Sequence, residues 1–303
     1  MKISVLGGCG FIGSSIAEKF LGMGHEVTVF DHPNTDKKNL CSIIGNIQFI
    51  GGDFLNPEDV EKAIQGAEIV FHAISTTLPS SALNNPAYDI ETNVVGSIRL
   101  FDLCVKHQVT KVCFLSSGGT VYGIPQELPI KESSPLNPIS PYGLSKLAIE
   151  KFLNLYNHHY GLDYSIVRLS NPYGIRQNPL SGQGVIASWA HRIKSGLPIE
   201  IWGDGNIVRD YIHIDDAIDA ITTITLSEGK ERVVNVGSGV GYSLNQLHHL
   251  FEDCLHRSLP VVYLPTRKVD VPINILDVSL LRTGFGWEAK IDITNGISRI
   301  IHE

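Results

Sequence analysis

The sequence predicts an α/β fold in which a doubly wound parallel sheet is joined to a smaller C-terminal α/β lobe. Short apolar runs alternate with stretches of helical periodicity from the N-terminus to about residue 170, which is the order that builds a parallel sheet. The first run ends in a glycine-rich turn, and a helix follows directly. Beyond this point the elements become shorter. We therefore expect a core domain over 1–170 and a lobe over 171–303, with some segments returning to the core.

The composition is that of a globular protein without a general affinity for nucleic acid or membranes. Of the 303 residues 43% are hydrophobic and 18% charged, and the net charge of −7 opposes binding to a polyanion. No run of about 18 apolar residues occurs, and the apolar start MKISVLGG is too short for a signal peptide. The five cysteines are scattered and form no C-x-x-C pair. We expect reduced thiols, no metal site and a cytoplasmic enzyme.

Apolar runs of about four to eight residues mark the expected strands, and longer amphipathic stretches mark the helices. Strands are predicted at 3–6, 26–30, 47–50, 69–72, 111–116, 162–169, 199–202 and 233–236. Helices are predicted at 14–21, from 57, and at 86–107, 142–160, 185–195, 214–226 and 244–255.

The first expected strand ends in the glycine-rich segment GGCGFIG at 7–13. Gly7 permits the tight turn, Gly10 lets the backbone approach a pyrophosphate, and Gly13 lets the helix pack closely on the strand. The N-terminus of that helix favours a phosphate. Asp31 ends the next strand, where a carboxylate can bind both ribose hydroxyls and repels a 2′-phosphate. Together these features predict a Rossmann-type dinucleotide site that prefers NAD to NADP.

Residues at later strand ends have more than one interpretation. Asp53 either caps the helix that begins near Pro57 or binds the adenine amino group. His72 is expected to be a packed histidine at a strand end and not a catalyst. The segment 73–77 that follows it should pass beneath the cofactor.

Tyr142 and Lys146 are four residues apart, so they project from the same face of a helix. A nearby ammonium favours ionisation of a phenol, which makes Tyr142 a candidate acid/base for a hydroxyl or carbonyl group. The spacing Tyr-x-x-x-Lys is common by chance and also fits an ordinary helix start. It gains weight because a redox cofactor site precedes it and because the hydroxyl-rich turn 116–120 ends the preceding strand.

A series of short motifs follows one order along the chain. They are GGCGFIG at 7–13, Asp31, GDF at 52–54, TVYG at 120–123, YGLSK at 142–146, NPYG at 171–174, WGDGNIVRDYIHIDD at 202–216 and RKVDVP at 267–272. In this set and order they resemble the extended short-chain dehydrogenase/reductase family. Within that family the resemblance is to nucleotide-sugar epimerases and dehydratases, with UDP-glucose 4-epimerases as the most similar group.

The resemblance implies tightly held NAD that is recycled within each turnover. Tyr142, ionised beside Lys146, takes the proton of the sugar 4-hydroxyl while hydride passes from C4 to NAD and returns on the opposite face of the 4-keto sugar. Ser117 or Thr120 is expected to serve as a further catalytic hydroxyl. The implied cofactor contacts are Gly7, Gly10, Phe11, Ile12, Gly13, Asp31, His32, Asp53, Phe54, Ala73, Ile74, Ser75, Asn93, Ser116, Tyr142 and Lys146.

The same resemblance implies a UDP-sugar site in the C-terminal lobe. Asn171 matches a residue that bonds the diphosphate or sugar, and Arg209 and Arg267 match two arginines that grip the diphosphate. Asp270 matches an acid that binds the uridine ribose. The alternatives are an ion pair with a neighbouring aspartate for Arg209 and an ordinary turn for Asp270. The expected substrate contacts are Ser117, Gly118, Asn171, Val185, Trp202, Arg209, Arg267 and Asp270.

Three places depart from the family's pattern. Gly118 stands where a hydroxyl usually assists the tyrosine, so Ser117, Thr120 or a water must supply it. Gly119 and Thr120 replace the Asp-Glu pair of 4,6-dehydratases, which excludes that chemistry. The same positions lack the glutamate of UDP-glucuronate decarboxylases. Asn274 occupies the position that sets tolerance for an N-acetyl group and is intermediate in size, so acetamido sugars stay open.

The sequence therefore predicts an NAD-dependent UDP-hexose 4-epimerase of the UDP-glucose/UDP-galactose type. A 4-epimerase of UDP-glucuronate, UDP-N-acetylglucosamine or a dTDP-sugar is the first alternative. The second is a regulator that senses the dinucleotide without chemistry, but such a protein has no need of Tyr142 and Lys146. The helices at 86–107 and 142–160 match those of a four-helix bundle in the family's homodimer, so we expect apolar exposed faces on both.

Overall fold

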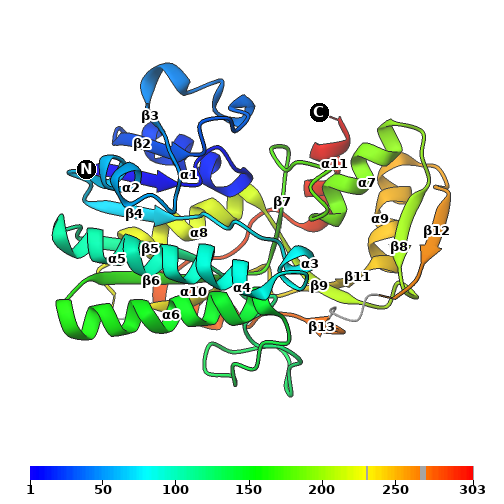
Figure 1. Ribbon diagram of the computed structural model, residues 1–303. Coiled ribbons are helices and arrows are strands. Elements are labelled where there is room, and N and C mark those ends of the chain that lie inside the picture. Colours follow the sequence, from blue (N-terminus) through cyan, green and yellow to red (C-terminus); the bar gives the residue numbers. More distant parts are fainter. Residues whose placement is uncertain (230, 267–270, 303) are drawn as a thin grey trace. The chain divides into compact units, whose positions relative to one another are not determined.

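The computed structural model describes residues 1–229, 231–266 and 271–302 (Figure 1). The chain forms two compact units, each assembled from three segments. The first unit comprises Met1–Ser117, Ser140–Arg168 and Ile221–Val234, and the second comprises Gly118–Ile139, Leu169–Ala220 and Asn235–Glu303. Segment 221–234 belongs to the first unit. Segment 118–139 belongs to the second unit, although it precedes the expected boundary near residue 170.

A seven-stranded parallel sheet runs through the first unit in the order β10-β6-β5-β4-β1-β2-β3. The strands are β1 (Lys2–Leu6), β2 (Glu26–Asp31), β3 (Gln48–Gly51), β4 (Ile69–His72), β5 (Lys111–Ser117), β6 (Asp163–Leu169) and β10 (Val233–Val236). The chain builds outward from β1 through β2 to β3 and then returns to β4 on the other side of β1. This reversal is the switch point at which open α/β sheets bind ligands. The predicted doubly wound fold class is confirmed.

Most of the predicted helices lie within a few residues of their predicted limits, whereas α3, α10 and α11 were not predicted. The helices are α1 (Phe11–Gly22), α2 (Pro57–Ile64), α3 (Pro79–Ala82), α4 (Pro86–Asp89), α5 (Gly96–Lys106), α6 (Pro141–Tyr160), α7 (Val185–Lys194), α8 (Ile214–Leu226), α9 (Leu244–Leu255), α10 (Ser279–Phe285) and α11 (Ile293–His302). The single helix predicted over 86–107 is interrupted by a π-helical turn, Ile90–Val95, between α4 and α5. No helix in the described part of the chain has the length and apolarity needed to cross a membrane.

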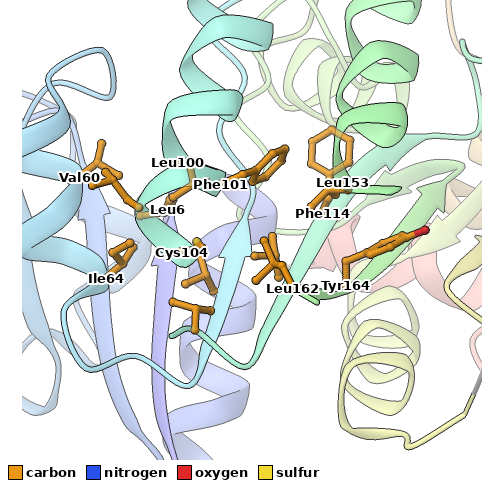
Figure 2. Close-up of a cluster of buried hydrophobic side chains, with 14 of the residues drawn as sticks. Leu6, Val60, Ile64, Leu100, Phe101, Cys104, Phe114, Leu153, Leu162 and Tyr164 are labelled. Atoms are coloured by element: carbon orange, nitrogen blue, oxygen red, sulfur yellow. The ribbon is translucent and has the colours of Figure 1, made fainter. Parts of the chain in front are cut away.

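Alternate strand residues point to opposite faces of the sheet, and each face has its own helices. One face packs against α2, α5 and α6 in the cluster drawn in Figure 2. Its labelled members are Leu6, Val60, Ile64, Leu100, Phe101, Cys104, Phe114, Leu153, Leu162 and Tyr164. On the other face Phe20 of α1 packs on Phe71 of β4, with 4.9 Å between ring centroids. Each such side chain contributes about 1.5–3 kcal/mol on burial, and together they fix the strand ends that carry the site.

The second unit is organised around β9 (Val208–His213). This strand pairs with β11 (Gly241–Ser243), β13 (Ile273–Asn274) and β7 (Asn171–Tyr173), while β8 (Ile199–Trp202) pairs with β12 (Val261–Leu264). A separate core formed by α7, α9, α11 and these strands includes Trp189 and Phe251, whose rings lie 5.9 Å apart. Only β8 among these strands was predicted. Charged residues interrupt β9, and β7, β11 and β13 have three residues or fewer, whereas the apolar run VVYL of β12 was missed.

Candidate active site

The turn between β1 and α1 depends on glycines at two close approaches. Gly7 has a φ of +83°, and its N–H donates to the carbonyl oxygen of Phe30 at 2.8 Å. A Cβ at Gly13 would lie 2.2 Å from the Gly7 carbonyl oxygen, so only glycine allows the helix to start here. Gly10 is the N-cap, and no side chain caps this end of α1. The first N–H groups after it, from Phe11 onward, are therefore placed for a phosphate.

Asp31 joins the end of β2 to this turn. Its Oδ2 accepts the backbone N–H of Cys9 at 2.9 Å, and its Oδ1 accepts the His32 N–H at 2.8 Å and the Thr35 hydroxyl at 3.1 Å. Each carboxylate oxygen has further acceptor capacity, so two ribose hydroxyls can still bind. The glycine turn and Asp31 fit the diphosphate and the adenosine ribose of NAD.

The loop after β3 uses its polar residues locally. Asp53 accepts the N–H of Leu55 at 2.9 Å, and the cap of α2 is Asn56, whose Oδ1 accepts the N–H of Glu58 at 3.1 Å. The suggestion that Asp53 caps α2 is therefore wrong, since Asn56 stands nearer the first helical residue. The Phe54 ring is buried, which leaves its backbone as the group that could meet an adenine.

The segment after β4 lies directly against the glycine turn. Ala73 donates its N–H to Leu6 at 3.0 Å, and a Cβ on Gly7 would lie 3.0 Å from the backbone of Ala73 and Ile74. His72 is fully packed, with Nε2 2.7 Å from the Ser97 hydroxyl. Burial lowers the pKa of His72 to about 3, so the imidazole is neutral and structural, as predicted.

Asn93, predicted to bind the cofactor, has its whole amide engaged by protein. Its Oδ1 accepts the N–H of Thr76 at 3.0 Å, and its Nδ2 donates to Thr77 Oγ1 at 3.2 Å and to Asp89 at 3.1 Å. Asn93 thus holds the segment beneath the expected cofactor site in place, and a direct cofactor contact stays a prediction.

Tyr142 and Lys146 lie in the first two turns of α6. Ser140 caps the helix by accepting the N–H of Gly143 at 3.2 Å, and Pro141 occupies the first helical position. The Lys146 ammonium donates to the Leu115 carbonyl oxygen at 2.9 Å and lies 5.7 Å from the centre of the Tyr142 ring. The positive end of the helix dipole also favours a phenolate at this position.

Burial opposes the charged form of both side chains. It raises the pKa of Tyr142 to about 12, and a hydrogen bond with the Ser75 hydroxyl opposes that rise. Burial lowers the pKa of Lys146 to about 8, against the attraction of Asp89 and then Glu150. The pair can exchange a proton with a bound hydroxyl only if each partner stabilises the charge of the other.

Ser116, predicted to contact the cofactor, is already engaged. Its hydroxyl donates to Glu150 Oε1 at 2.5 Å, and Glu150 forms a buried, two-pronged ion pair with Arg168 whose shortest contact is 2.7 Å. Ser117 is the last residue of β5 and is half-buried. A catalytic role for the Ser117 hydroxyl stays a prediction.

The turn that follows β5 belongs to the second unit and is anchored there. Gly118 donates its N–H to Leu169 at 2.9 Å, and its carbonyl oxygen accepts Nδ2 of Asn274 at 2.9 Å. Asn274 is fully buried, so its amide serves first to hold this turn. The Thr120 hydroxyl is buried and has no partner among the residues that the structure describes.

A cavity of about 340 Å³ opens in the second unit. It is lined by four of the predicted substrate contacts, Asn171, Val185, Trp202 and Arg209. Asn171 donates to the Asp210 carbonyl oxygen at 2.9 Å, and Arg209 donates to the carbonyl oxygens of two residues, at 2.6 and 2.9 Å. These bonds orient both side chains at the wall. The predicted contacts Arg267 and Asp270 lie outside the described residues.

Sequence patterns did not identify several residues that belong to these sites. Trp189 and Tyr211 also line the cavity, but their apolar spacing is that of ordinary core residues. Asp89 forms hydrogen bonds to residues around Tyr142 and Lys146, but as a single acid inside an expected helix it carried no signal.

His248, His249 and Glu252 on α9 are the described residues closest to a metal-ligand set. His248 also contacts the Leu259 carbonyl oxygen at 3.1 Å, and Glu252 accepts the Leu259 N–H at 2.9 Å, which accounts for the cluster as a helix-end network.

Comparison with known proteins identifies the family of this chain. The model of the NAD dependent epimerase/dehydratase family matches residues 3–237. A UDP-glucose 4-epimerase of Mycolicibacterium smegmatis is 32% identical over 99% of this chain and 97% of its own length. The crystal structure of UDP-glucose 4-epimerase from Thermotoga maritima with UDP-glucose superposes with a TM-score of 0.94, at 34% identity over 100% of this chain and 98% of that one. The Thermus thermophilus UDP-glucose 4-epimerase in complex with NAD gives a TM-score of 0.93, at 32% identity over 100% and 98%. The chain belongs to the NAD dependent epimerase/dehydratase family.

Proposed function

We propose that the protein is an NAD-dependent 4-epimerase of UDP-hexose, of the UDP-glucose/UDP-galactose type. The observation that carries this proposal is the pair of half-buried Tyr142 and buried Lys146, held in the same unit as the glycine turn and Asp31. A phenol and an ammonium one helical turn apart are suited to moving one proton on and off a hydroxyl group. A dinucleotide bound at the adjacent switch point supplies the redox partner that such a proton transfer needs.

Each residue of the pair has a distinct task. Tyr142 takes the proton from the sugar 4-hydroxyl and returns it after the sugar has turned over. Lys146 keeps a positive charge beside the phenolate, and the N-terminus of α6 adds a positive dipole end. NAD+, when bound, would supply the acceptor for the C4 hydride and the donor for its return. Because the proton and the hydride both return to the sugar, the reaction needs no other reductant.

The turn after β5 limits the chemistry to C4. Gly119 and Thr120 offer no carboxylate that could remove a proton at C5, so elimination of water from C5 and C6 lacks its acid and base. We assign the assisting hydroxyl to Thr120 or Ser117. The two solved structures described above are named for the same 4-epimerisation, and one of them was solved with UDP-glucose.

The cavity of the second unit is the proposed site for the nucleoside diphosphate. Arg209 supplies a guanidinium for the diphosphate, Asn171 an amide, and Trp202 and Val185 apolar surface for the base. Arg267 and Asp270 are proposed to complete the site. The nucleotide is assigned as UDP because the similar enzymes act on UDP-glucose.

We also propose that the enzyme is a cytoplasmic homodimer. Exposed apolar side chains occur along α6, at Leu144 and Leu155, and around α4, at Tyr88 and Ile90. Two copies that pair these helices would bury the side chains in a four-helix bundle, as apolar patches on a surface favour. All five cysteines are free thiols, which suits a reducing compartment.

The experiment that tests the function uses purified protein and a panel of nucleotide sugars. UDP-glucose, UDP-N-acetylglucosamine, UDP-glucuronate and dTDP-glucose are each incubated with the enzyme, and the 4-epimers are resolved by chromatography. We expect conversion of UDP-glucose to be fastest. Faster conversion of another sugar would reassign the substrate, and conversion of none would contradict the epimerase proposal.

A further inference from the structure

Asp89, the last residue of α4, is fully buried, and both of its carboxylate oxygens accept hydrogen bonds. Oδ1 accepts from the Thr77 hydroxyl and from Nδ2 of Asn93, and Oδ2 accepts from the Ser145 hydroxyl. These donors come from three different segments of the first unit. Each oxygen acts only as an acceptor, as an ionised carboxylate requires.

Two chains of contacts lead from this carboxylate to Tyr142. The first passes through Ser145, which lies on α6 between Tyr142 and Lys146 in the sequence and donates its hydroxyl to Asp89. The second passes through Thr77, whose carbonyl oxygen accepts the Ser75 hydroxyl at 2.9 Å. The Ser75 hydroxyl is in turn the hydrogen-bond partner of Tyr142. Asp89 therefore ties the start of α6 to the segment that follows β4.

The π-helical turn after Asp89 strengthens this tie. Widened turns of this kind occur often at functional sites. Here the turn carries Asn93, whose Nδ2 reaches both the carboxylate and the carbonyl oxygen of Asp89 at 3.1 Å. Its Oδ1 accepts the Thr76 N–H at 3.0 Å. Asp89 and Asn93 thus both bind Thr77, and Asn93 also binds the neighbouring Thr76.

The charges around Lys146 show why this carboxylate matters. Glu150 faces Lys146 from one turn further along α6, but Arg168 on β6 already matches its charge through the buried ion pair. His72 faces Lys146 from β4 and is neutral. From β5 the neighbours are the Leu115 carbonyl oxygen and the Phe114 ring, whose centre lies 4.8 Å from the ammonium nitrogen. Of the two acids that act on Lys146, Asp89 is therefore the one whose negative charge the Lys146 ammonium balances.

We propose that Asp89 is a positioning residue for the epimerase reaction: its buried carboxylate fixes Tyr142 through Ser145 and Thr77 and supplies the counter-charge that keeps Lys146 an ammonium ion. This rests on the proposed function, since it assigns Asp89 a part in the same proton transfer. A buried lysine without such a partner favours the neutral amine. A neutral Lys146 could no longer stabilise the Tyr142 phenolate.

The substitution Asp89→Asn tests this with a side chain of the same shape. Asp89 raises the pKa of Lys146 and also raises the pKa of Tyr142. Its removal therefore lowers both, although the pair titrates as a coupled unit. We expect the pH profile of kcat to move to lower pH on both limbs by about one unit. Ser145→Ala is the matched control, because it removes a hydrogen bond and keeps the charge, so it should slow turnover without moving either limb.

A second measurement does not depend on turnover. The ¹³C resonances of labelled lysine side chains are titrated by NMR, and Lys146 is assigned by its absence in Lys146→Arg. We expect a midpoint near 8 in the wild-type protein and a lower one in Asp89→Asn. If Asp89→Asn does not fold, the wild-type midpoint decides: a value well below 7 would mean that no carboxylate supports the ammonium and would overturn the proposal.

The outcomes separate the two proposals. An Asp89→Asn enzyme that is slower but keeps the wild-type pH limbs and the wild-type Lys146 midpoint would reduce Asp89 to a structural residue. A protein that epimerises no nucleotide sugar, yet shows the shifted Lys146 midpoint, would contradict the proposed function and leave Asp89 as the counter-charge of Lys146.

Discussion

Lys146 lies one helical turn after Tyr142, with its ammonium nitrogen 5.7 Å from the centre of the Tyr142 ring and 2.9 Å from the Leu115 carbonyl oxygen. The ammonium therefore donates to the strand while facing the phenol across the start of α6. Burial works against both charges. Catalysis here depends on their mutual attraction, on the helix dipole and on the positive charge of a bound nicotinamide.

Thr120→Val should lower the activity of the enzyme without lowering its stability. The Thr120 hydroxyl is buried without a partner in the described protein, so replacing it with a methyl group removes an unsatisfied polar group. We expect the free energy of unfolding to stay the same or to rise by about 1 kcal/mol, while turnover falls by about tenfold or more. Urea denaturation and steady-state kinetics measure the two effects. Wild-type turnover in Thr120→Val together with a slow Ser117→Ala would assign the assisting hydroxyl to Ser117.

Gly13→Ala should abolish NAD binding. The added Cβ would lie 2.2 Å from the Gly7 carbonyl oxygen, so the glycine turn must open. Gly22→Ala is the matched control on the same helix, because a Cβ there meets nothing within 4 Å, and it should stabilise the protein by up to about 1 kcal/mol. Isothermal titration with NAD compares the variants. A Gly13→Ala protein that binds NAD as the wild type does would exclude this turn as the phosphate site.

His72 should make the protein sensitive to acid. Burial lowers its folded-state pKa from 6.5 to about 3, so the unfolded state binds the extra proton between these values. Stability is therefore complete above pH 6.5 and is lost as the pH falls, by about 1.4 kcal/mol per pH unit. His72→Gln should flatten this dependence between pH 6.5 and 4.5 in urea denaturation. His158→Gln, on the exposed end of α6, should leave it unchanged, and equal slopes in all three proteins would refute the assignment.

Leu144→Glu should dissociate the proposed dimer. Leu144 is 54% exposed on α6, and a carboxylate there would have to lose its water in the helix bundle at a high cost. Light scattering after gel filtration should show a monomer with unchanged circular dichroism. Leu180→Glu, at a 77% exposed position, should remain dimeric. A wild-type protein that is already monomeric at micromolar concentration would contradict the dimer itself.

The sheet, its flanking helices and the two-part motif of glycine turn and Asp31 could be predicted because they are encoded locally. Apolar runs, helix caps such as Ser140 and the short spacing from Gly7 to Gly13 lie within single segments. The family resemblance was confirmed for the same reason, since its motifs are contiguous. The spacing of Tyr142 and Lys146 alone did not identify a catalytic pair. It did so only together with the dinucleotide motif that precedes it in the chain.

What the sequence could not reveal depends on contacts between distant segments. Asp89 bonds to Thr77 and Ser145, which stand 12 and 56 positions away, and no local pattern marks such a carboxylate. The strand β9 was missed because Arg209 and Asp210 interrupt its apolar run, and its partners β7, β11 and β13 lie far along the chain. Asp53 was suggested as the cap of α2, but the cap is Asn56, three residues later. Spacing rules do not place a helix end that accurately.

The central claim is that a proton leaves the sugar 4-hydroxyl and a hydride leaves C4, and that both return to the sugar within one site. UDP-glucose carrying deuterium at C4 tests it, with NMR used to follow the label in the product. We predict UDP-galactose that keeps its deuterium at C4, formed by the wild-type enzyme and slowed about 10²–10⁴-fold in Tyr142→Phe, with Tyr160→Phe on the same helix unaffected. Loss of the deuterium to solvent, or no epimer from any labelled UDP-hexose, would contradict the account.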